Sequence, residues 1–221
     1  CGRWHCIACA PCAGVTRSAE MTDVALVLAS ASPRRRELLQ RLGVSFTCQP
    51  ADIDESVHAG EAPEDYVARM AREKAAVVVD ATAGEQPVLA ADTSVVIDND
   101  ILGKPRDHFD GLAMLARLSG RTHTVMTAIC LHTAQDSNCE VISTEVTFTG
   151  LDRASCEAYL ATDEPWDKAG GYGIQGLGGA FVSAIEGSYS NVVGLPLCET
   201  WRLLAAHGIH TSLDQAPEDR S

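Results

Sequence analysis

Short apolar runs alternate with amphipathic stretches along this chain, and they predict a series of strands and helices. Residues 26–29 (LVLA) form an apolar run that fits a buried strand, and residues 88–98 (VLAADTSVVID) form a longer one. Residues 63–79 carry apolar side chains at helical spacing, which predicts an amphipathic helix. Similar signals predict strands at 44–48, 101–105, 122–132, 140–148, 180–185 and 191–195, and helices at 107–118, 152–161 and 196–206.

Residues 26–43 (LVLASASPRRRELLQRLG) hold the most informative pattern, a strand followed by a Ser-rich turn and a helix. Ser32 is a favourable N-cap residue, and Pro33 then takes the first helical position, where its missing N–H costs nothing. Three arginines, residues 34–36, follow in the first turn, although the helix dipole disfavours cations there. Because a helix N-terminus attracts anions, this stretch indicates a site for a multiply charged anion such as a triphosphate; a basic surface turn is the alternative.

Charged side chains also interrupt apolar stretches elsewhere. Lys74 lies on the apolar face of the helix predicted at 63–79, where a lysine either snorkels to water or delivers its ammonium into a cleft. Asp92 lies inside the apolar run 88–98, where an unpaired carboxylate is costly, so it is expected to be paired, bound to a metal or facing a site. The acidic residues of the segment 52–55 form either a solvated turn or part of a divalent-cation site.

Residues 163–179 contain six glycines within ten positions, which excludes a regular element and lets the backbone approach a ligand closely. Lys168 and Gln175 within this stretch favour a binding loop over a plain flexible loop. Residues 171–176 match the G-x-G-x-x-G dinucleotide fingerprint, but the match is weak because a helix precedes it and a strand follows it. A dinucleotide oxidoreductase is an alternative that depends on this match alone.

The overall composition excludes some functions. The chain has 221 residues, enough for one large domain, and a formal net charge of −13 at pH 7. So acidic a chain is not expected to bind duplex nucleic acid, and an anionic substrate would need a local basic pocket or a metal ion. No apolar run approaches the roughly 20 residues that a membrane span needs.

The two ends of the chain differ from the rest. Residues 1–20 lack periodicity and the apolar region of a signal peptide, so we expect the functional domain to cover residues 21–210, after an upstream extension or disordered arm. A metal site at Cys6, Cys9 and Cys12 is the alternative, although no fourth ligand is evident. The other cysteines are scattered, which suits reduced cytosolic thiols. Residues 211–221 form a polar tail that is expected to fray.

Several motifs in collinear order resemble the Maf family of nucleoside triphosphate pyrophosphatases. The matching pieces are SASPRR at 30–35, AREK at 71–74, ADT at 91–93, GKP at 103–105, DEP at 163–165, DKAG at 167–170, YGIQG at 172–176 and NVVGLP at 191–196. They extend over residues 25–206, and a set of motifs of this length is far more specific than the lone glycine fingerprint.

The resemblance implies an α/β fold with a mixed sheet and two lobes around a central cleft, related in architecture to the inosine-triphosphate pyrophosphatases. It implies hydrolysis of a nucleoside triphosphate to the monophosphate and pyrophosphate, with Mg or Mn as the divalent cation. The Ile174-Gln175-Gly176 sequence is similar to the branch that acts on dTTP, UTP and related or modified pyrimidine nucleotides as a house-cleaning activity. The branch that acts on 7-methyl-GTP carries a Ser-Glu type sequence there.

The resemblance also implies roles for single residues. The catalytic set is Asp92, as the proton acceptor, with Lys74 and Lys104. The substrate-binding set is Ser30, Arg34, Arg35, Thr93, Lys168 and Gln175. Asp92 and, as our own candidate from the acidic segment 52–55, Glu55 are the candidate metal ligands. The cations would neutralise the triphosphate, while Thr93 and Gln175 would read the base, since an amide offers a donor and an acceptor to the O4 and N3–H edge of uracil or thymine.

Two further alternatives stay open at this point. One is the same reaction on 7-methyl-GTP or another modified purine nucleotide, and the other is a nucleotide-binding regulator of septum formation. A nucleoside triphosphate is the expected partner, and a homodimer is compatible with the fold. Neither nucleic acid nor a membrane is expected as a partner, and the expected location is the cytoplasm.

Overall fold

The computed structural model describes residues 25–82, 84 and 86–214. The predicted leader with its Cys6, Cys9 and Cys12, and residues 215–221 of the predicted tail, lie outside this part of the chain. Residues 211–214, which we expected to fray, are instead ordered. Thr211 is buried and donates from its backbone N–H and its hydroxyl to Asp214 Oδ2, at 2.7 and 2.9 Å. The Ser212 N–H donates to the Leu42 carbonyl at 2.8 Å, which holds this turn against the first helix.

In the described residues, one mixed sheet of seven strands has the order β2-β1-β3-β5-β6-β7, with β4 paired to β3. The strands are β1 (Leu26–Leu28), β2 (Phe46–Cys48), β3 (Val88–Ile97), β4 (Asp100–Leu102), β5 (Thr122–His132), β6 (Ser137–Phe148) and β7 (Val182–Glu186). The helices are α1 (Pro33–Arg41), α2 (Pro63–Ala81), α3 (His108–Leu118), α4 (Arg153–Leu160), α5 (Tyr189–Val193) and α6 (Leu197–Ala206). Two 3₁₀ helices, η1 (Ala169–Gly171) and η2 (Leu177–Phe181), lie in the glycine-rich segment.

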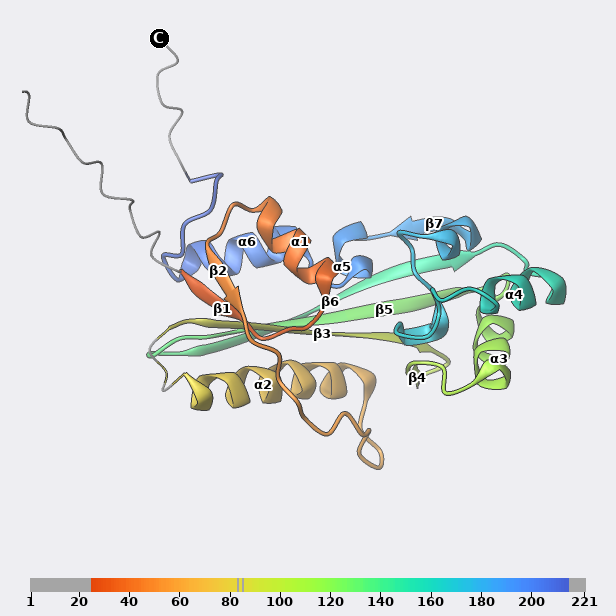
Figure 1. Ribbon diagram of the computed structural model, residues 1–221, viewed down its shortest axis with the longest axis horizontal. Coiled ribbons are helices and arrows are strands. Elements are labelled where there is room, and N and C mark those ends of the chain that lie inside the picture. Colours follow the sequence, from red (N-terminus) through yellow and green to blue (C-terminus); the bar gives the residue numbers. More distant parts are fainter. Residues whose placement is uncertain (1–24, 83, 85, 215–221) are drawn as a thin grey trace, which may run out of the picture.

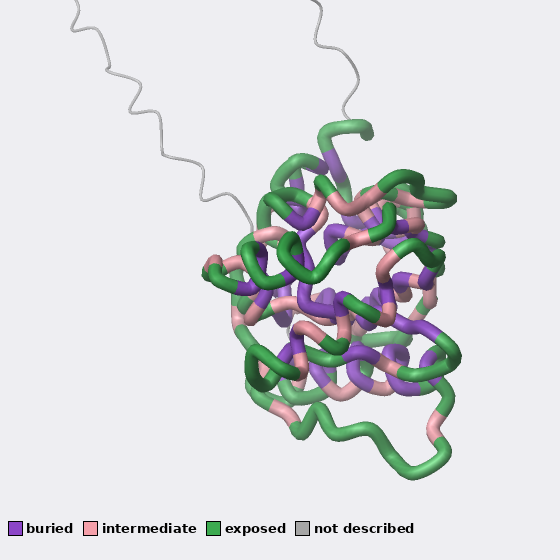
Figure 2. The backbone as a smooth tube through the Cα atoms, turned by 90° about the vertical axis from the view of Figure 1, so that its right-hand side faces the viewer, coloured by how far each residue is buried: buried purple, intermediate pink, exposed green. Residues whose placement is uncertain are grey.

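The helices cover both faces of the sheet (Figure 1). The helix α2 packs on one face through apolar side chains such as Val67 and Ala71, together with Val88 and Ala90 of β3. Helices α1 and α6 pack on the other face, and α3 and α4 lie at the far end of the long strands. Buried residues are concentrated in the interior between these layers, and exposed residues lie around the outside (Figure 2). The predicted mixed α/β fold is therefore confirmed.

The predicted strand at 191–195 is wrong, because residues 189–193 form the short helix α5. Ser188 caps this helix by accepting the N–H of Asn191 on its side chain, and Gly194, at φ 118°, ends it. The amide Nδ2 of Asn191 donates to the Val125 carbonyl at 3.0 Å, so the helix is bonded to β5. A contact 66 residues away in the chain thus overrides the local β-branched pattern.

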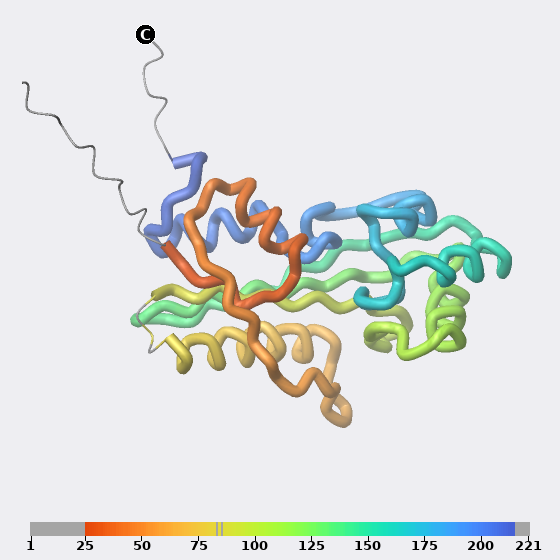
Figure 3. The backbone as a smooth tube through the Cα atoms, viewed as in Figure 1, coloured from red at the N-terminus to blue at the C-terminus, as the bar shows by residue number. Residues whose placement is uncertain are grey.

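A gap beside the interior strand β3 creates the place for a site. Strands β1 and β4 both pair with β3 on the edge opposite β5; β1 pairs at Val88 and Leu89, and β4 pairs at residues 95–97. Within the described residues, β3 has no strand partner on this edge between those two contacts. Because side chains alternate along a strand, Asp92 continues the face covered by α2 and Thr93 the opposite face. Side chains from both faces of β3 therefore border the gap. Figure 3 shows α2, in gold, on one side of the strands and α1, in orange, on the other.

A buried histidine beyond this gap predicts acid sensitivity. His123 is 2% exposed, and its Nε2 bonds to the Tyr172 hydroxyl at 2.8 Å. Burial lowers the pKa of His123 to about 4. Since its unfolded pKa is about 6.5, the unfolded state binds more protons between these values, and the free energy of unfolding falls by about 3 kcal/mol as pH drops from 7 to 4.

Urea unfolding of the wild type and of His123→Gln at pH 7 and pH 4 measures this contribution. The variant should lose about 3 kcal/mol less stability across the interval than the wild type does. An equal loss in both proteins would show that the acid sensitivity arises elsewhere.

Candidate active site

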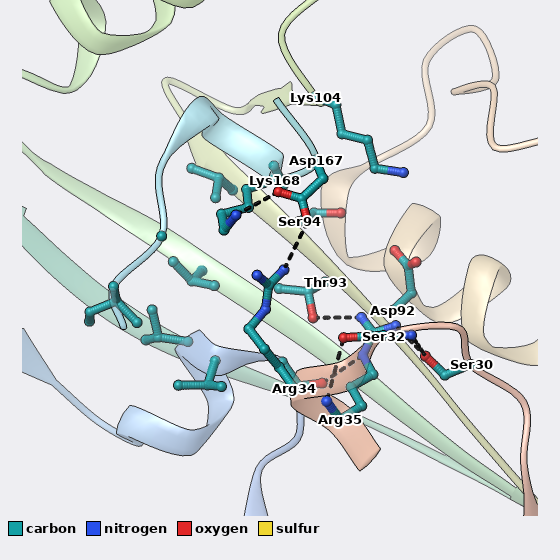
Figure 4. A pocket seen from close by; sticks show the side chains of 18 of the residues that line it. Ser30, Ser32, Arg34, Arg35, Asp92, Thr93, Ser94, Lys104, Asp167 and Lys168 are labelled. Carbon is teal, nitrogen blue, oxygen red and sulfur yellow. Dashed lines mark hydrogen bonds and ion pairs between the residues drawn. The ribbon is translucent and has the colours of Figure 1, made fainter. Parts of the chain in front are cut away.

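A cavity of about 890 Å³ occupies the gap beside β3, between β1 and β4. Its walls come from the turn between β1 and α1, from β3 and β4, and from the glycine-rich loop, residues 163–179 (Figure 4). All ten residues that the sequence singled out line it: Ser30, Arg34, Arg35, Glu55, Lys74, Asp92, Thr93, Lys104, Lys168 and Gln175. The sequence therefore predicted which residues come together, and a cavity of this size suits a nucleotide-sized ligand.

The first turn of α1 presents two arginines to the cavity. The Arg35 guanidinium donates to the Gly194 carbonyl at 2.9 Å, to Thr93 Oγ1 at 3.0 Å and to Ser30 Oγ at 3.5 Å. Burial is the main cause that lowers the pKa of Arg35. These three acceptors are neutral, so they orient the guanidinium without cancelling its charge. Arg34 makes only a loose ion pair, 4.0 Å from Asp167. This helix start therefore offers positive charge to an anion.

Lys74 reaches from α2 into the cavity and does not snorkel to water. Its Nζ lies 2.6 Å from Asp92 Oδ1 and 2.7 Å from Glu55 Oε1. Lys104 Nζ lies 3.6 Å from Glu55 Oε2. Burial alone would raise the pKa of Glu55, but hydrogen bonds and positive charge from Lys74 and Lys104 outweigh it and lower the pKa. Asp92 is thus a buried carboxylate with an ionic partner, as its position in an apolar strand required.

The acidic loop that carries Glu55 is fastened to α2. The Tyr66 hydroxyl donates to the Glu55 carbonyl at 2.9 Å. Arg69 binds Glu61 through Nε and Nη2, at 2.6 and 2.7 Å, and also donates to the Ser56 carbonyl at 2.9 Å. Bidentate arginine–carboxylate pairs fix geometry well, so this clamp holds Glu55 beside Lys74.

The glycine-rich loop is organised around Glu164, a residue to which the sequence assigned no role. Its carboxylate accepts the Tyr159 hydroxyl at 2.9 Å and the N–H groups of Leu177 and Gly178 at 2.8 and 3.0 Å. A Cβ at Gly176 would lie 2.2 Å from Glu164 Oε2, which explains a glycine there. The two N–H groups bonded to Glu164 fix the backbone just after the exposed Gln175, and the Gly173 N–H, which donates to the Tyr159 hydroxyl at 3.1 Å, fixes it just before. The sequence gives only a weak indication of this role for Glu164, because the N–H groups that it binds lie 13 and 14 residues further along the chain.

The Lys168 ammonium is already bonded within the protein, so it is not free to bind a phosphate. Its Nζ donates to the Glu164 carbonyl at 2.6 Å and pairs with Asp167 Oδ1 at 2.5 Å. Asp167 therefore lies between Lys168 and Arg34 at the cavity wall (Figure 4). The fingerprint segment 171–176 runs from the last residue of η1 to the start of η2 and does not form a strand-to-helix turn. The dinucleotide interpretation consequently lacks the structural context that it requires.

Two carboxylates of the cavity could hold a divalent cation, those of Asp92 and Glu55. Both lie beside Lys74 Nζ, at 2.6 and 2.7 Å, so they are close to each other. Within residues 25–82, 84 and 86–214, no three His, Cys, Asp or Glu side chains are grouped to hold a metal by themselves. Proteins commonly bind Mg²⁺ through one or two carboxylates together with substrate phosphates, so Asp92 and Glu55 are the residues that could hold it.

Comparisons with known proteins identify the family of this chain. The family model for Maf-like proteins matches residues 25–207. The chain belongs to the Maf family. A dTTP/UTP pyrophosphatase of Shewanella sp. (strain MR-7) is 53% identical over 191 residues, which cover 83% of this chain and 98% of that protein. A dTTP/UTP pyrophosphatase of Myxococcus xanthus is 55% identical over 184 residues, which cover 83% and 93%.

Among solved structures, a nucleoside-triphosphatase / dITP/XTP pyrophosphatase from Mycobacterium abscessus is similar over 57% of this chain and 74% of its own, with 20% identity and a TM-score of 0.39. In the described part of the chain, no helix is both long enough and apolar enough to cross a membrane.

Proposed function

We propose that this chain hydrolyses dTTP and UTP to the nucleoside monophosphate and pyrophosphate. The observation that carries the proposal is the convergence of Arg34, Arg35, Lys74 and Lys104 with Asp92 on one cavity. The relatives from Shewanella and Myxococcus, named dTTP/UTP pyrophosphatases, support the substrate class. An acidic protein, at −13, needs such a local cationic cavity to admit a triphosphate.

In this reaction Asp92 accepts a proton from water, and the water oxygen attacks the α-phosphorus. The bond from that phosphorus to the oxygen bridging the α- and β-phosphates breaks, and pyrophosphate leaves. Phosphoryl transfer depends on positioning and on charge stabilisation, which the cations of α1 and α2 and Lys104, just after β4, provide. Lys74 Nζ, 2.6 Å from Asp92 Oδ1, holds one carboxylate oxygen and leaves Oδ2 as the atom that we assign to the water.

We assign the divalent cation, Mg or Mn, to Asp92 and Glu55 together with the phosphate oxygens of the substrate. When bound, such an ion would neutralise phosphate charge and help to ionise water. Gln175 and Thr93, which both line the cavity, would contact the base. An amide can pair with both the O4 acceptor and the N3–H donor of uracil or thymine.

A substrate panel tests the proposal. The protein is incubated with Mg²⁺ and dTTP, UTP, CTP, GTP or 7-methyl-GTP, and orthophosphate, pyrophosphate and monophosphate are quantified. We expect pyrophosphate and monophosphate in equal amounts, with dTTP and UTP turned over fastest. Release of orthophosphate would overturn the reaction type. A preference for 7-methyl-GTP would overturn the substrate, and nucleotide binding without any product would favour a regulator.

Glu164→Gln should weaken substrate binding without removing the chemistry. An amide cannot accept all three hydrogen bonds, and one N–H group of the loop would face an NH₂ group. We expect the KM for UTP to rise about tenfold with kcat within about threefold, and the free energy of unfolding to fall by about 1–2 kcal/mol. Steady-state kinetics and urea unfolding measure the two effects.

Glu157→Gln is the matched control for this variant. Glu157 is exposed and pairs within its own helix with Arg153, so its amide should leave both quantities unchanged. An unchanged KM in Glu164→Gln would show that the loop does not position the substrate.

A further inference from the structure

We infer that Thr127, a buried residue of β5 behind the cavity wall, fixes the direction of the Thr93 hydroxyl so that Thr93 can only accept a hydrogen bond from the substrate. Thr127 would thereby act as a positioning residue for the choice among pyrimidine bases. The inference rests on the proposed function and deepens it. Thr93 lines the cavity, and Thr127 lies opposite it in the antiparallel pair of β3 and β5, 0% exposed.

The direction of each hydrogen bond follows from the chemistry of its ends. Thr127 Oγ1 lies 2.9 Å from the Asn191 carbonyl oxygen, which can only accept, so the single hydroxyl proton of Thr127 points there. Thr93 Oγ1 lies 2.9 Å from Thr127 Oγ1. Since Thr127 has no second proton to give, Thr93 must be the donor in this bond.

At Thr93 the direction of the second hydrogen bond is fixed as well. Arg35 Nη2 donates to Thr93 Oγ1 at 3.0 Å, and a guanidinium has no acceptor atom. A hydroxyl offers one proton and two lone pairs. The proton of Thr93 is used by Thr127 and one lone pair by Arg35, so only a lone pair remains for a ligand. Figure 4 shows the contact between Arg35 and Thr93 at the cavity wall.

The backbone carbonyl of Asn191, which accepts the Thr127 hydroxyl, is held firmly in place. Asn191 is 0% exposed, and its Nδ2 donates to the Val125 carbonyl at 3.0 Å and to Thr144 Oγ1 at 2.9 Å. The N-cap of α5 by Ser188 adds a further constraint. The Asn191 carbonyl therefore cannot turn away easily, and Thr127 stays committed to it.

A lone pair of Thr93 facing the cavity favours a base that presents a hydrogen-bond donor over one that presents an acceptor. Uracil and thymine carry a proton on N3, and cytosine carries a lone pair there. The geometry therefore favours UTP and dTTP over CTP, because a site built to accept a proton repels an acceptor placed against it. A sugar hydroxyl could also donate to Thr93, but it would do so equally in UTP and CTP.

The test compares UTP with CTP in Thr127→Val, a change of similar shape that removes the acceptor for Thr93. The freed hydroxyl of Thr93 can then turn and donate into the cavity. We expect the ratio of kcat/KM for UTP to that for CTP to fall about tenfold, with CTP turned over faster than by the wild type. Thr127→Ser, which keeps the hydroxyl, should restore the wild-type ratio.

Thr122→Val is the matched control. It breaks a bond of the same kind, between Thr122 Oγ1 and Thr147 Oγ1 at 2.8 Å, on strands β5 and β6 away from the cavity. The ratio should stay at the wild-type value in this variant. An equal fall with UTP and CTP in Thr127→Val would overturn the inference, because it would indicate a structural role or a sugar contact.

A double variant shows whether Thr127 acts through Thr93. Thr93→Val and Thr93→Val/Thr127→Val should have the same ratio; a further change in the double variant would contradict the inference. If Thr127→Val does not fold, Thr93→Val alone must still show the loss of discrimination, and titration calorimetry with UTP and CTP must show it in the Kd ratio. A wild type that releases pyrophosphate from UTP and CTP equally well defeats this inference alone, whereas one that releases none from UTP defeats the proposed function.

Discussion

Replacing Asp92 with asparagine should reduce UTP hydrolysis by about 10³-fold while nucleotide binding is kept. The amide has nearly the shape of the carboxylate, and its oxygen can still accept from Lys74 Nζ, which lies 2.6 Å away in the native protein. It cannot take a proton from water. The loss should therefore appear in kcat, measured as pyrophosphate release, with the Kd for UTP changed by less than about fivefold.

Asp98→Asn is the control for this experiment. Asp98 lies in the turn between β3 and β4 and pairs with Arg121 outside the cavity, so its amide should not alter kcat. The more informative comparison is Glu55→Gln, because Glu55 also bonds to Lys74. If Glu55→Gln abolished turnover and Asp92→Asn did not, the proton acceptor would be Glu55 and the assignment would be reversed.

The site could be predicted from sequence where its signals are local or where a residue contradicts its surroundings. Ser32 and Pro33 define the start of α1 by themselves, and the structure confirms both positions. Asp92 and Lys74 stood out because each interrupts an apolar stretch, and they prove to be partners 18 residues apart. A buried charge that needs a counter-charge is thus visible in sequence before its partner is known.

The missed features depend on contacts between distant segments. Thr127 looks like any β-branched strand residue, and its partner Asn191 lies 64 residues away. Thr127 bonds to the backbone carbonyl of Asn191, whereas the Asn191 side chain, which bonds to β5, explains why α5 is a helix where its composition suggested a strand. Residue propensity predicts the secondary structure of a five-residue segment poorly when hydrogen bonds to distant segments decide its conformation.

Lys74→Met should destabilise the protein by about 3–5 kcal/mol, because it leaves the buried carboxylate of Asp92 without its partner. The Lys74 and Asp92 side chains are only 11% and 12% exposed. The methionine can fill the space of the lysine stem, so the loss reports the missing charge and not a cavity. Urea unfolding near neutral pH measures it.

The double variant Lys74→Met/Asp92→Asn distinguishes the interaction energy of Lys74 with Asp92 from the contribution of the other contacts of Lys74. Once Asp92 is uncharged, removal of Lys74 should cost at most about 1–2 kcal/mol, so the two changes will not be additive. Lys104→Met provides the contrast, since Lys104 is 60% exposed and 3.6 Å from Glu55, and it should alter stability by less than about 0.5 kcal/mol. Additive effects in the double variant would mean that Lys74 and Asp92 are not energetically coupled. In that case Lys74 would serve the nucleotide alone, and the ion pair would not be what holds Asp92 at the cavity.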